Sequence, residues 1–209
     1  MSAAAEASLR AFFAVELGAS ARAAAAAVVR ELRRRDERHV VRFPRPESLH
    51  VTLRFLGDVP TARLAGLVAS VAKEAASVAP FDLRLGDPMA FPSARRPRVL
   101  AVAALPVEPL ARAAAAVERG CVAFGFAPEP RPFRGHLTLG RVKHGPGRET
   151  GARPPCFDGI ALPGHEPTAV RDAVLFQSEL RPDGARYTPL ERVPFGGPVN
   201  DSDDSEPRP

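Results

Sequence analysis

Two histidines, each followed two residues later by a threonine, are the side chains of this sequence best suited to chemistry. The motif His-Val-Thr-Leu at 50–53 returns, with one conservative change, as His-Leu-Thr-Leu at 136–139. Residues two apart on a β-strand point to the same face, so each motif would place an imidazole beside a hydroxyl. One His-x-Thr is more often a packed pair with a satisfied hydrogen bond. The same pattern twice, each time inside an apolar run, favours a functional site.

These residue types fit the transfer of two protons beside a growing negative charge. A neutral imidazole with an ordinary pKa of about 6.5 can accept a proton, and an imidazolium can donate one, at physiological pH. Hydroxyl donors such as Thr52 and Thr138 stabilise negative charge that develops in a transition state. Neither motif has a neighbouring Asp, Glu, His or Cys at metal-ligand spacing, so we expect no metal site and no cofactor.

The flanks of both motifs extend the pattern into a family resemblance. Residues 43–59, Phe-Pro-Arg-Pro-Glu-Ser-Leu-His-Val-Thr-Leu-Arg-Phe-Leu-Gly-Asp-Val, resemble the first signature of the 2H phosphoesterases, in particular the RNA 2',3'-cyclic phosphodiesterases, also called 2'-5' RNA ligases. Residues 131–142 resemble the second signature. Segments 12–17 and 175–190 are also similar in order and spacing, so the resemblance spans roughly residues 9–195. Gly135 stands where the family commonly has Pro, and we expect this change to affect only local rigidity.

The resemblance implies an enzyme that hydrolyses a terminal 2',3'-cyclic phosphate of RNA to a 2'-phosphate without a metal. It assigns His50 as general acid and His136 as general base. It also implies that three side chains hold the phosphate: Thr52, Thr138 and Arg141. A guanidinium suits bidentate phosphate binding. The acid and base order comes from the family pattern alone. Because the steps are reversible, the same site could join a cyclic phosphate to a 5'-hydroxyl and form a 2'-5' linkage.

Two other functions remain open. The chain could be a 2H phosphoesterase that acts on small cyclic nucleotides or 2'-5' oligonucleotides, which a preference for mononucleotides over RNA ends would reveal. It could also be a non-catalytic RNA-binding module, although the intact histidines and threonines of both motifs speak against this.

Several further side chains are weaker candidates for binding the rest of an RNA strand. They are Arg54, Arg134 and Lys143, with Phe55 and Phe133 as rings that could stack on a base. Strand alternation places Arg54 on the face of His50 and Thr52, but a solvated edge position is the better interpretation. For the two phenylalanines, packing in the core is the better interpretation.

The charge balance agrees with a polyanionic partner. The chain carries a net charge of +5, and residues 200–209 contain four acidic side chains and one Arg, so the remaining 199 residues carry +8. A basic body attracts phosphates, although an Arg-rich composition alone would also give a merely solvated basic surface.

No run of 18 apolar residues is present, so we expect no membrane span. Cys121 and Cys156 lack paired spacing and suit free thiols in a reducing compartment. We expect a cytoplasmic monomer whose partner is RNA with a 2',3'-cyclic phosphate end.

The elements that must position the motifs predict an α+β fold. Expected helices span 20–38, with Ser20 as N-cap, 61–78 and 108–124. Expected strands are 10–17, 40–43, 81–85, 99–104 and the two motif strands, of which the first spans 48–56 and ends at a break at 57–58. A loop at 86–98 is expected between 81–85 and 99–104. Residues 173–180 and 187–193 are expected to form a closing hairpin.

A helix precedes each motif strand, which predicts two related halves that bring the motif strands face to face. We therefore expect one two-lobed domain over residues 1–195, with antiparallel sheets flanking a central cleft and helices outside. The resemblance implies the same duplicated 2H phosphoesterase fold. Residues 196–209 are expected to form a disordered acidic tail.

Overall fold

The structure is a computed structural model that describes residues 7–93, 97–143, 160–181 and 184–196. Its elements follow one another along the chain as β1 (Ser8–Glu16), α1 (Ala19–Arg35), β2 (Val41–Arg42), β3 (His50–Pro60), α2 (Leu64–Ala75), β4 (Phe81–Phe91), β5 (Val99–Leu105), α3 (Val107–Ala123), β6 (His136–Val142), β7 (Thr168–Val170), β8 (Asp172–Arg181) and β9 (Gly184–Pro194). Short 3-10 helices at Pro46–Ser48 and Thr61–Arg63 precede β3 and α2.

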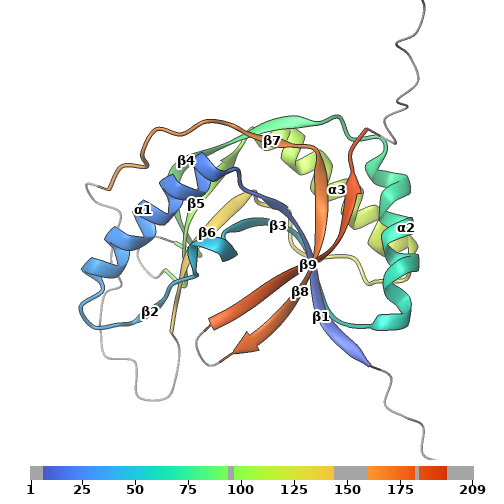
Figure 1. Ribbon diagram of the computed structural model, residues 1–209, viewed down its shortest axis with the longest axis horizontal. Helices are drawn as coiled ribbons and strands as arrows, with labels where there is room; N and C mark the ends of the chain where they lie inside the picture. Colours follow the sequence, from blue (N-terminus) through green and yellow to red (C-terminus); the bar gives the residue numbers. More distant parts are fainter. Residues whose placement is uncertain (1–6, 94–96, 144–159, 182–183, 197–209) are drawn as a thin grey trace, which may run out of the picture.

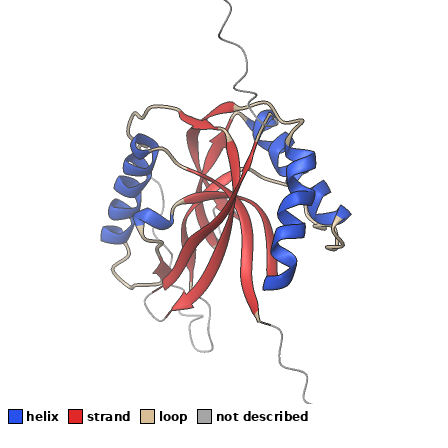
Figure 2. Cartoon of the chain, turned by 45° about the vertical axis from the view of Figure 1, so that its right-hand side comes forward, coloured by secondary structure: helices blue, strands red, loops and turns tan. Residues whose placement is uncertain are grey.

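The described strands form one antiparallel sheet in the order β7-β4-β5-β6-β3-β1-β8-β9, with β2 paired to β6. The α+β class and the duplicated fold are confirmed. The two expected sheets are halves of a single curled sheet, joined where Val51 of β3 pairs with Leu137 of β6. In Figures 1 and 2, α1 lies beside one half of the curled sheet and α2 with α3 beside the other half. The buried side chains of all three helices belong to one core with those of the strands.

The strand order shows the duplication directly. Reading outward from the β3–β6 pair, each motif strand is followed by a partner strand, β1 or β5, and then by β8 or β4. The motif strands are therefore the innermost strands of the two halves. Any side chain that they present to the same face comes close to its counterpart.

Successive side chains of the two motif strands point alternately to the face of the sheet that the helices cover and to the face that carries the motif histidines and threonines. Val51 and Leu53 of β3, like Leu137 and Leu139 of β6, are buried in the main hydrophobic core beneath the helices. Each such side chain contributes about 1.5–3 kcal/mol of stability relative to an exposed one. The histidines and threonines of the motifs point the other way, and we call this side of the sheet the site face.

The site face has a small apolar cluster of its own. Phe12 and Ala14 of β1 pack there with Val174 and Phe176 of β8, and Tyr187 of β9 packs against them. This cluster lies beside the first motif, because Ala14 pairs with Thr52 in the sheet.

A β-bulge in β3 overturns the expected placement of Arg54. Ala14 pairs with Thr52 while Phe13 pairs with Arg54, so Leu53 is an extra residue in the ladder and reverses the alternation after it. Arg54 thus turns to the helix face, where it is only 8% exposed. The prediction that it shares the face of His50 was wrong.

Arg54 instead forms an ion-pair cluster in which its guanidinium is buried and the two carboxylates are partly exposed. Its Nε lies 2.9 Å from an Oε of Glu118, and one Nη donates to Glu129 at 3.1 Å. The other Nη donates to the carbonyl of Ala127. This cluster connects β3 to α3 and to the segment that leads towards the second motif.

Several element boundaries also differ from expectation. β3 continues through the expected break, because Gly57 adopts a φ of +74° next to a second bulge. β4 continues to Phe91, through the first part of the expected loop, so that only residues 92–98 lie between β4 and β5. Ser20 does not cap α1; its hydroxyl accepts a hydrogen bond from the Glu166 N–H. β7 was not predicted, since its three residues are too few to show a period.

Two expectations lie outside the described residues: the tail beyond Gly196 and the state of Cys156. None of the helices in the described ranges is both long and apolar enough to cross a bilayer.

The Arg54 cluster yields a stability prediction. Arg54→Met should lower the free energy of unfolding by about 1–3 kcal/mol, because it removes the buried cation that two partly exposed carboxylates and the Ala127 carbonyl share. Arg119→Met is the matched control, since Arg119 pairs with Glu74 at the surface and its loss should cost under about 1 kcal/mol. Urea unfolding of both variants measures the difference, and equal losses would contradict the structural role assigned to Arg54.

Candidate active site

Both motif histidines are held in the same way, by the carbonyl of the residue two positions earlier, just before each strand begins. His50 Nδ1 lies 2.8 Å from the Ser48 carbonyl, and His136 Nδ1 lies 2.7 Å from the Arg134 carbonyl. A carbonyl only accepts hydrogen bonds, so each Nδ1 carries the proton and the Nε2 of each neutral imidazole is unprotonated. The Thr52 hydroxyl lies 3.1 Å from His50 Nε2 and donates to it.

The antiparallel pairing of β3 with β6 places the two motifs side by side. With Val51 opposite Leu137, the register directs His50 towards Thr138 and Thr52 towards His136. The four motif side chains therefore share the site face around the centre of the duplication.

Arg141 completes the predicted set. It follows the second motif on β6 and is exposed to solvent. Its positive charge acts on both His50 and His136, so it lies within electrostatic reach of each imidazole. The structure thus brings together all five side chains singled out from the sequence.

Apolar surroundings favour the neutral form of both imidazoles. The ring of His50 contacts Phe12 at a centroid distance of 4.8 Å and meets the edge of Tyr187 at 5.0 Å. This burial lowers the pKa of His50 to about 4, against the opposing effect of the Ser48 carbonyl. Burial likewise lowers the pKa of His136, whose ring lies 4.9 Å from that of Phe91. The charge of Arg141 lowers both pKa values further.

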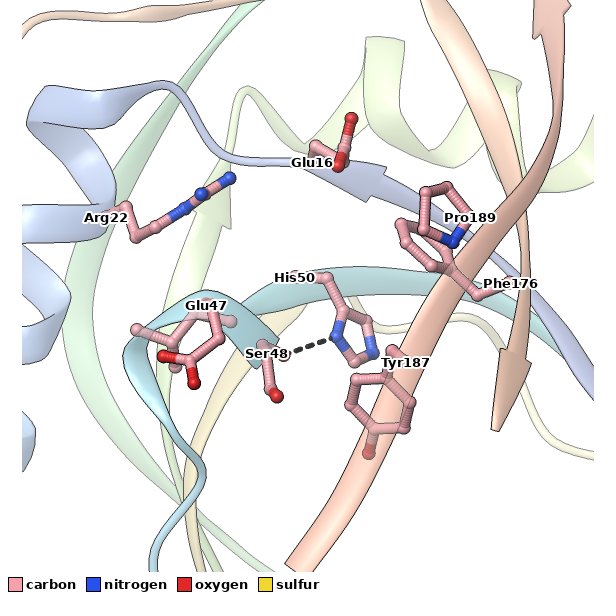
Figure 3. Close-up of a pocket in the computed structure, with 9 residues that line it drawn as sticks. Glu16, Arg22, Glu47, Ser48, His50, Phe176, Tyr187 and Pro189 are labelled. Atoms are coloured by element: carbon pink, nitrogen blue, oxygen red, sulfur yellow. Dashed lines mark hydrogen bonds between the residues drawn. The ribbon is translucent and has the colours of Figure 1, made fainter. Parts of the chain in front are cut away.

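A pocket of about 90 Å³ adjoins His50 and contains residues that the motifs did not reveal (Figure 3). Tyr187, Glu16 and Arg22 line it. Arg22 Nε is buried and has no hydrogen-bond partner among the described residues. The Tyr-Thr-Pro-Leu segment at 187–190 was a sequence signal for Tyr187. Arg22 had no such signal, because it lies in an Ala- and Arg-rich helix where many positions look alike.

The structure places the weaker candidates for RNA binding in different surroundings. Arg134 lies over the ring of Phe91, with its guanidinium carbon 5.9 Å from the centroid. Lys143 Nζ donates to the carbonyl of His39 at 2.7 Å. Phe133 packs against the core as predicted. Phe55 does not, and its ring is 53% exposed.

Other reactive groups in the described chain are structural. Burial raises the pKa of the Cys121 thiol to about 12, so it is protonated and unreactive at neutral pH. His165 Nε2 accepts a hydrogen bond from the Leu85 N–H. Across the described ranges, no three His, Cys, Asp or Glu side chains converge as metal ligands would.

The low pKa of His50 predicts how stability responds to acid. The unfolded chain takes up a proton on this imidazole near pH 6.5, whereas the folded chain does so only near pH 4. Stability should therefore fall as the pH drops through this window, by up to about 1.4 kcal/mol per pH unit from this group. His50→Gln should flatten the dependence of the unfolding free energy on pH between about 6.5 and 4. If the free energy of unfolding of wild type and of His50→Gln depends on pH in the same way, the lowered pKa of His50 is contradicted.

Comparisons with known proteins agree with this geometry. The model of the family "LigT like Phosphoesterase" matches residues 15–101 and again 104–187, once for each half. A Methanothermobacter thermautotrophicus protein named RNA 2',3'-cyclic phosphodiesterase is 31% identical over 88% of this chain and 97% of its own length. An Archaeoglobus fulgidus protein of the same name is 31% identical over 87% and 98%.

Solved structures show the same fold. The Thermus thermophilus protein TT0787 superposes with a TM-score of 0.69 at 28% identity, covering 90% of this chain and 99% of its own. E. coli LigT in complex with 3'-AMP gives a TM-score of 0.68 at 24% identity, with the same coverage. The two matched repeats, the duplicated sheet and the paired His-x-Thr motifs lead to one conclusion: this chain belongs to the LigT-like phosphoesterases of the 2H superfamily.

Proposed function

We propose that the protein is an RNA 2',3'-cyclic phosphodiesterase that opens a terminal cyclic phosphate to a 2'-phosphate without a metal ion. The observation that carries this proposal is the matched pair of imidazoles, each with its Nδ1 proton held by the carbonyl two residues earlier and its Nε2 unprotonated. Two such nitrogens on one face, beside Arg141, can move both protons that the reaction requires. The names of the relatives support the same reaction.

In the proposed mechanism, water attacks phosphorus in line with the ribose O3'. His136 Nε2 takes the proton of the attacking water while the new P–O bond forms. The P–O3' bond breaks, and the protonated Nε2 of His50 gives its proton to O3'. The phosphate stays on O2', which yields the 2'-phosphate.

The remaining motif residues are proposed to hold the non-bridging phosphate oxygens. Thr52 and Thr138 supply hydroxyl donors, and Arg141 supplies charge together with paired N–H donors. In the structure the Thr52 hydroxyl donates to His50 Nε2. When that nitrogen is protonated it no longer accepts a hydrogen bond, so the Thr52 proton becomes free for a phosphate oxygen.

The low pKa of His50 puts a condition on its role as general acid. At neutral pH this imidazole is neutral in the free protein, because burial and the charge of Arg141 disfavour its protonation. An anionic phosphate placed between the histidines opposes both effects and raises the pKa. Binding of the substrate is therefore coupled to uptake of a proton.

One assay tests the proposed function. Purified protein in EDTA should convert an RNA that ends in a 2',3'-cyclic phosphate to the 2'-phosphate product, which chromatography against 2'- and 3'-phosphate standards identifies. Loss of turnover in EDTA with recovery on adding a divalent ion would refute the metal-free mechanism. A 3'-phosphate product would refute the identity of the leaving oxygen.

The two histidines are separated by a leaving-group experiment. His50→Ala and His136→Ala should each lower turnover by about 10²-fold to 10⁴-fold while the fold remains intact. A substrate with sulfur in place of O3' needs no protonation of the leaving group, so it should rescue the variant that lacks the general acid. We expect rescue of His50→Ala. Rescue of His136→Ala instead would reverse the acid and base order, and rescue of neither would mean that the histidines mainly bind phosphate.

Turnover and binding measurements on further substrates address the alternatives. Faster turnover of cyclic mononucleotides or 2'-5' oligonucleotides than of RNA ends would favour a small-nucleotide phosphoesterase. Binding of RNA without turnover would favour a non-catalytic module. Formation of a 2'-5' linkage from a cyclic phosphate and a 5'-hydroxyl would add ligation to the activity. The buried, protonated Cys121 suits the reducing cytoplasm in which we propose that the enzyme acts.

A further inference from the structure

Two arginines face each other across the β2–β6 pair. β2 lies beside the end of β6 (Figure 1), where Arg42 pairs directly with Arg141. Both side chains are exposed. Directly opposed residues of an antiparallel pair point to the same face, with their Cβ atoms about 5 Å apart. Like charges at such positions repel each other, so the pair lowers stability unless an anion neutralises it.

This pair is an exception in the sheet. Among the described residues, no other pair of like charges is set opposite each other by the strand register. Where charged residues do meet, their charges are opposite, since Arg10 pairs with Asp58 and Glu179 with Arg186. Within the described ranges, neither arginine of the β2–β6 pair has an ion-pair or hydrogen-bond partner for its guanidinium. The N–H donors of both are therefore available to a ligand.

Both arginines belong to the site face. Val41 is buried in the main core, so Arg42, the next residue of β2, points the other way. In β6 the ladder with β5 skips Leu139, and this bulge reverses the alternation of the strand. Gly140 consequently faces the core, where a Cβ would lie 2.7 Å from Val41 Cγ1, and Arg141 returns to the site face.

The arginine pair continues the series of motif side chains on this face. The register of β6 with β3 and then with β2 orders three cross-strand pairs: Thr52 with His136, His50 with Thr138, and Arg42 with Arg141. The arginines therefore lie beyond His50 and away from His136. The charge of Arg141 lowers the pKa of both histidines, whereas Arg42 is not among the charges that do so. Arg42 is thus the outer of the two cations.

The proposed mechanism gives the direction in which an RNA strand leaves the site. His50 protonates O3' of the terminal ribose, so the terminal nucleoside lies on the side of His50. The phosphodiester that precedes this nucleoside is bonded to O5' of the same ribose. It is one nucleotide away from the scissile phosphate, on the side where Arg42 lies beyond Arg141.

We propose that Arg42 binds the phosphodiester that precedes the terminal nucleoside, while Arg141 holds the cyclic phosphate. This inference rests on the proposed function and narrows its substrate class to RNA ends with at least one internal phosphate, in preference to cyclic mononucleotides. A planar guanidinium suits the two non-bridging oxygens of a phosphodiester. Because the contact is with the backbone, it does not depend on the base sequence.

A kinetic experiment compares three substrates with a 2',3'-cyclic phosphate end. They are cyclic adenosine monophosphate of this 2',3' type, the dinucleotide adenylyl-adenosine, and the same dinucleotide with an uncharged methylphosphonate linkage. Arg42→Gln should raise KM for the phosphodiester dinucleotide by about 3-fold to 30-fold, the equivalent of one lost charge-assisted contact. KM for the other two substrates and kcat for all three should change little. Arg112→Gln, which removes a cation paired with Glu108 on α3, is the matched control and should leave all values unchanged.

The salt dependence of binding identifies the phosphate contact without turnover. Adenylyl-adenosine 2'-phosphate is titrated calorimetrically at several salt concentrations, with adenosine 2'-monophosphate for comparison. Each neutralised phosphate of a single strand contributes about 0.7 to the slope of log K against log salt. Arg42→Gln should reduce the slope by this amount for the dinucleotide only. Arg42→Lys should keep the slope, because it keeps the charge, but should recover only part of the affinity, because an ammonium lacks the bidentate fork.

The outcomes distinguish this inference from the proposed function. An equal loss on all three substrates, an equal loss on both dinucleotides, or no loss on any would refute phosphate binding by Arg42 while the phosphodiesterase activity stands. If the wild-type protein hydrolyses none of the substrates, the proposed function fails, and the titration still decides whether Arg42 binds an internal phosphate.

Discussion

The arrangement of the site depends on one short contact, the antiparallel pairing of Val51 with Leu137. Both side chains are fully buried beneath the helices, so the pairing is fixed by the core and not by the polar groups that it positions. A shift of one residue in either strand would turn its histidine and threonine into the core and its buried apolar residues towards solvent. The hydrophobic core therefore determines where the imidazoles lie, and the polar face needs no contacts of its own to do so.

The surroundings of the histidines fix their protonation as well as their place. A carbonyl just before the strand holds each Nδ1 proton, and the aromatic rings of Phe12 and Tyr187 bury His50. The site is consequently a pair of neutral acceptors beside a cation, Arg141. An anion would balance this charge, which agrees with the proposed binding of phosphate.

The sequence was sufficient to predict the family, the α+β class, the duplication and the residues that meet at the site, because core packing alone does not require the same polar motif in two apolar strands. It was not sufficient to predict the consequences of the bulges. Alternation placed Arg54 on the site face, and core packing was the better interpretation of Phe55, but Leu53 reverses both assignments. A bulge depends on the partner strand, so nothing in the local pattern of one strand reveals it. The same holds for Arg22, which is near His50 only because α1 packs there.

Tyr187 gives the site an optical property. It is the one tyrosine of the sequence, which also lacks tryptophan. Its ring is held perpendicular to His50 and nearly so to Phe12. The near-ultraviolet circular dichroism beyond the phenylalanine bands therefore arises from a single phenol in van der Waals contact with a motif histidine. Any event that reorients or charges that imidazole changes the asymmetry around this chromophore, so the folded protein has a built-in spectroscopic reporter for one half of its site.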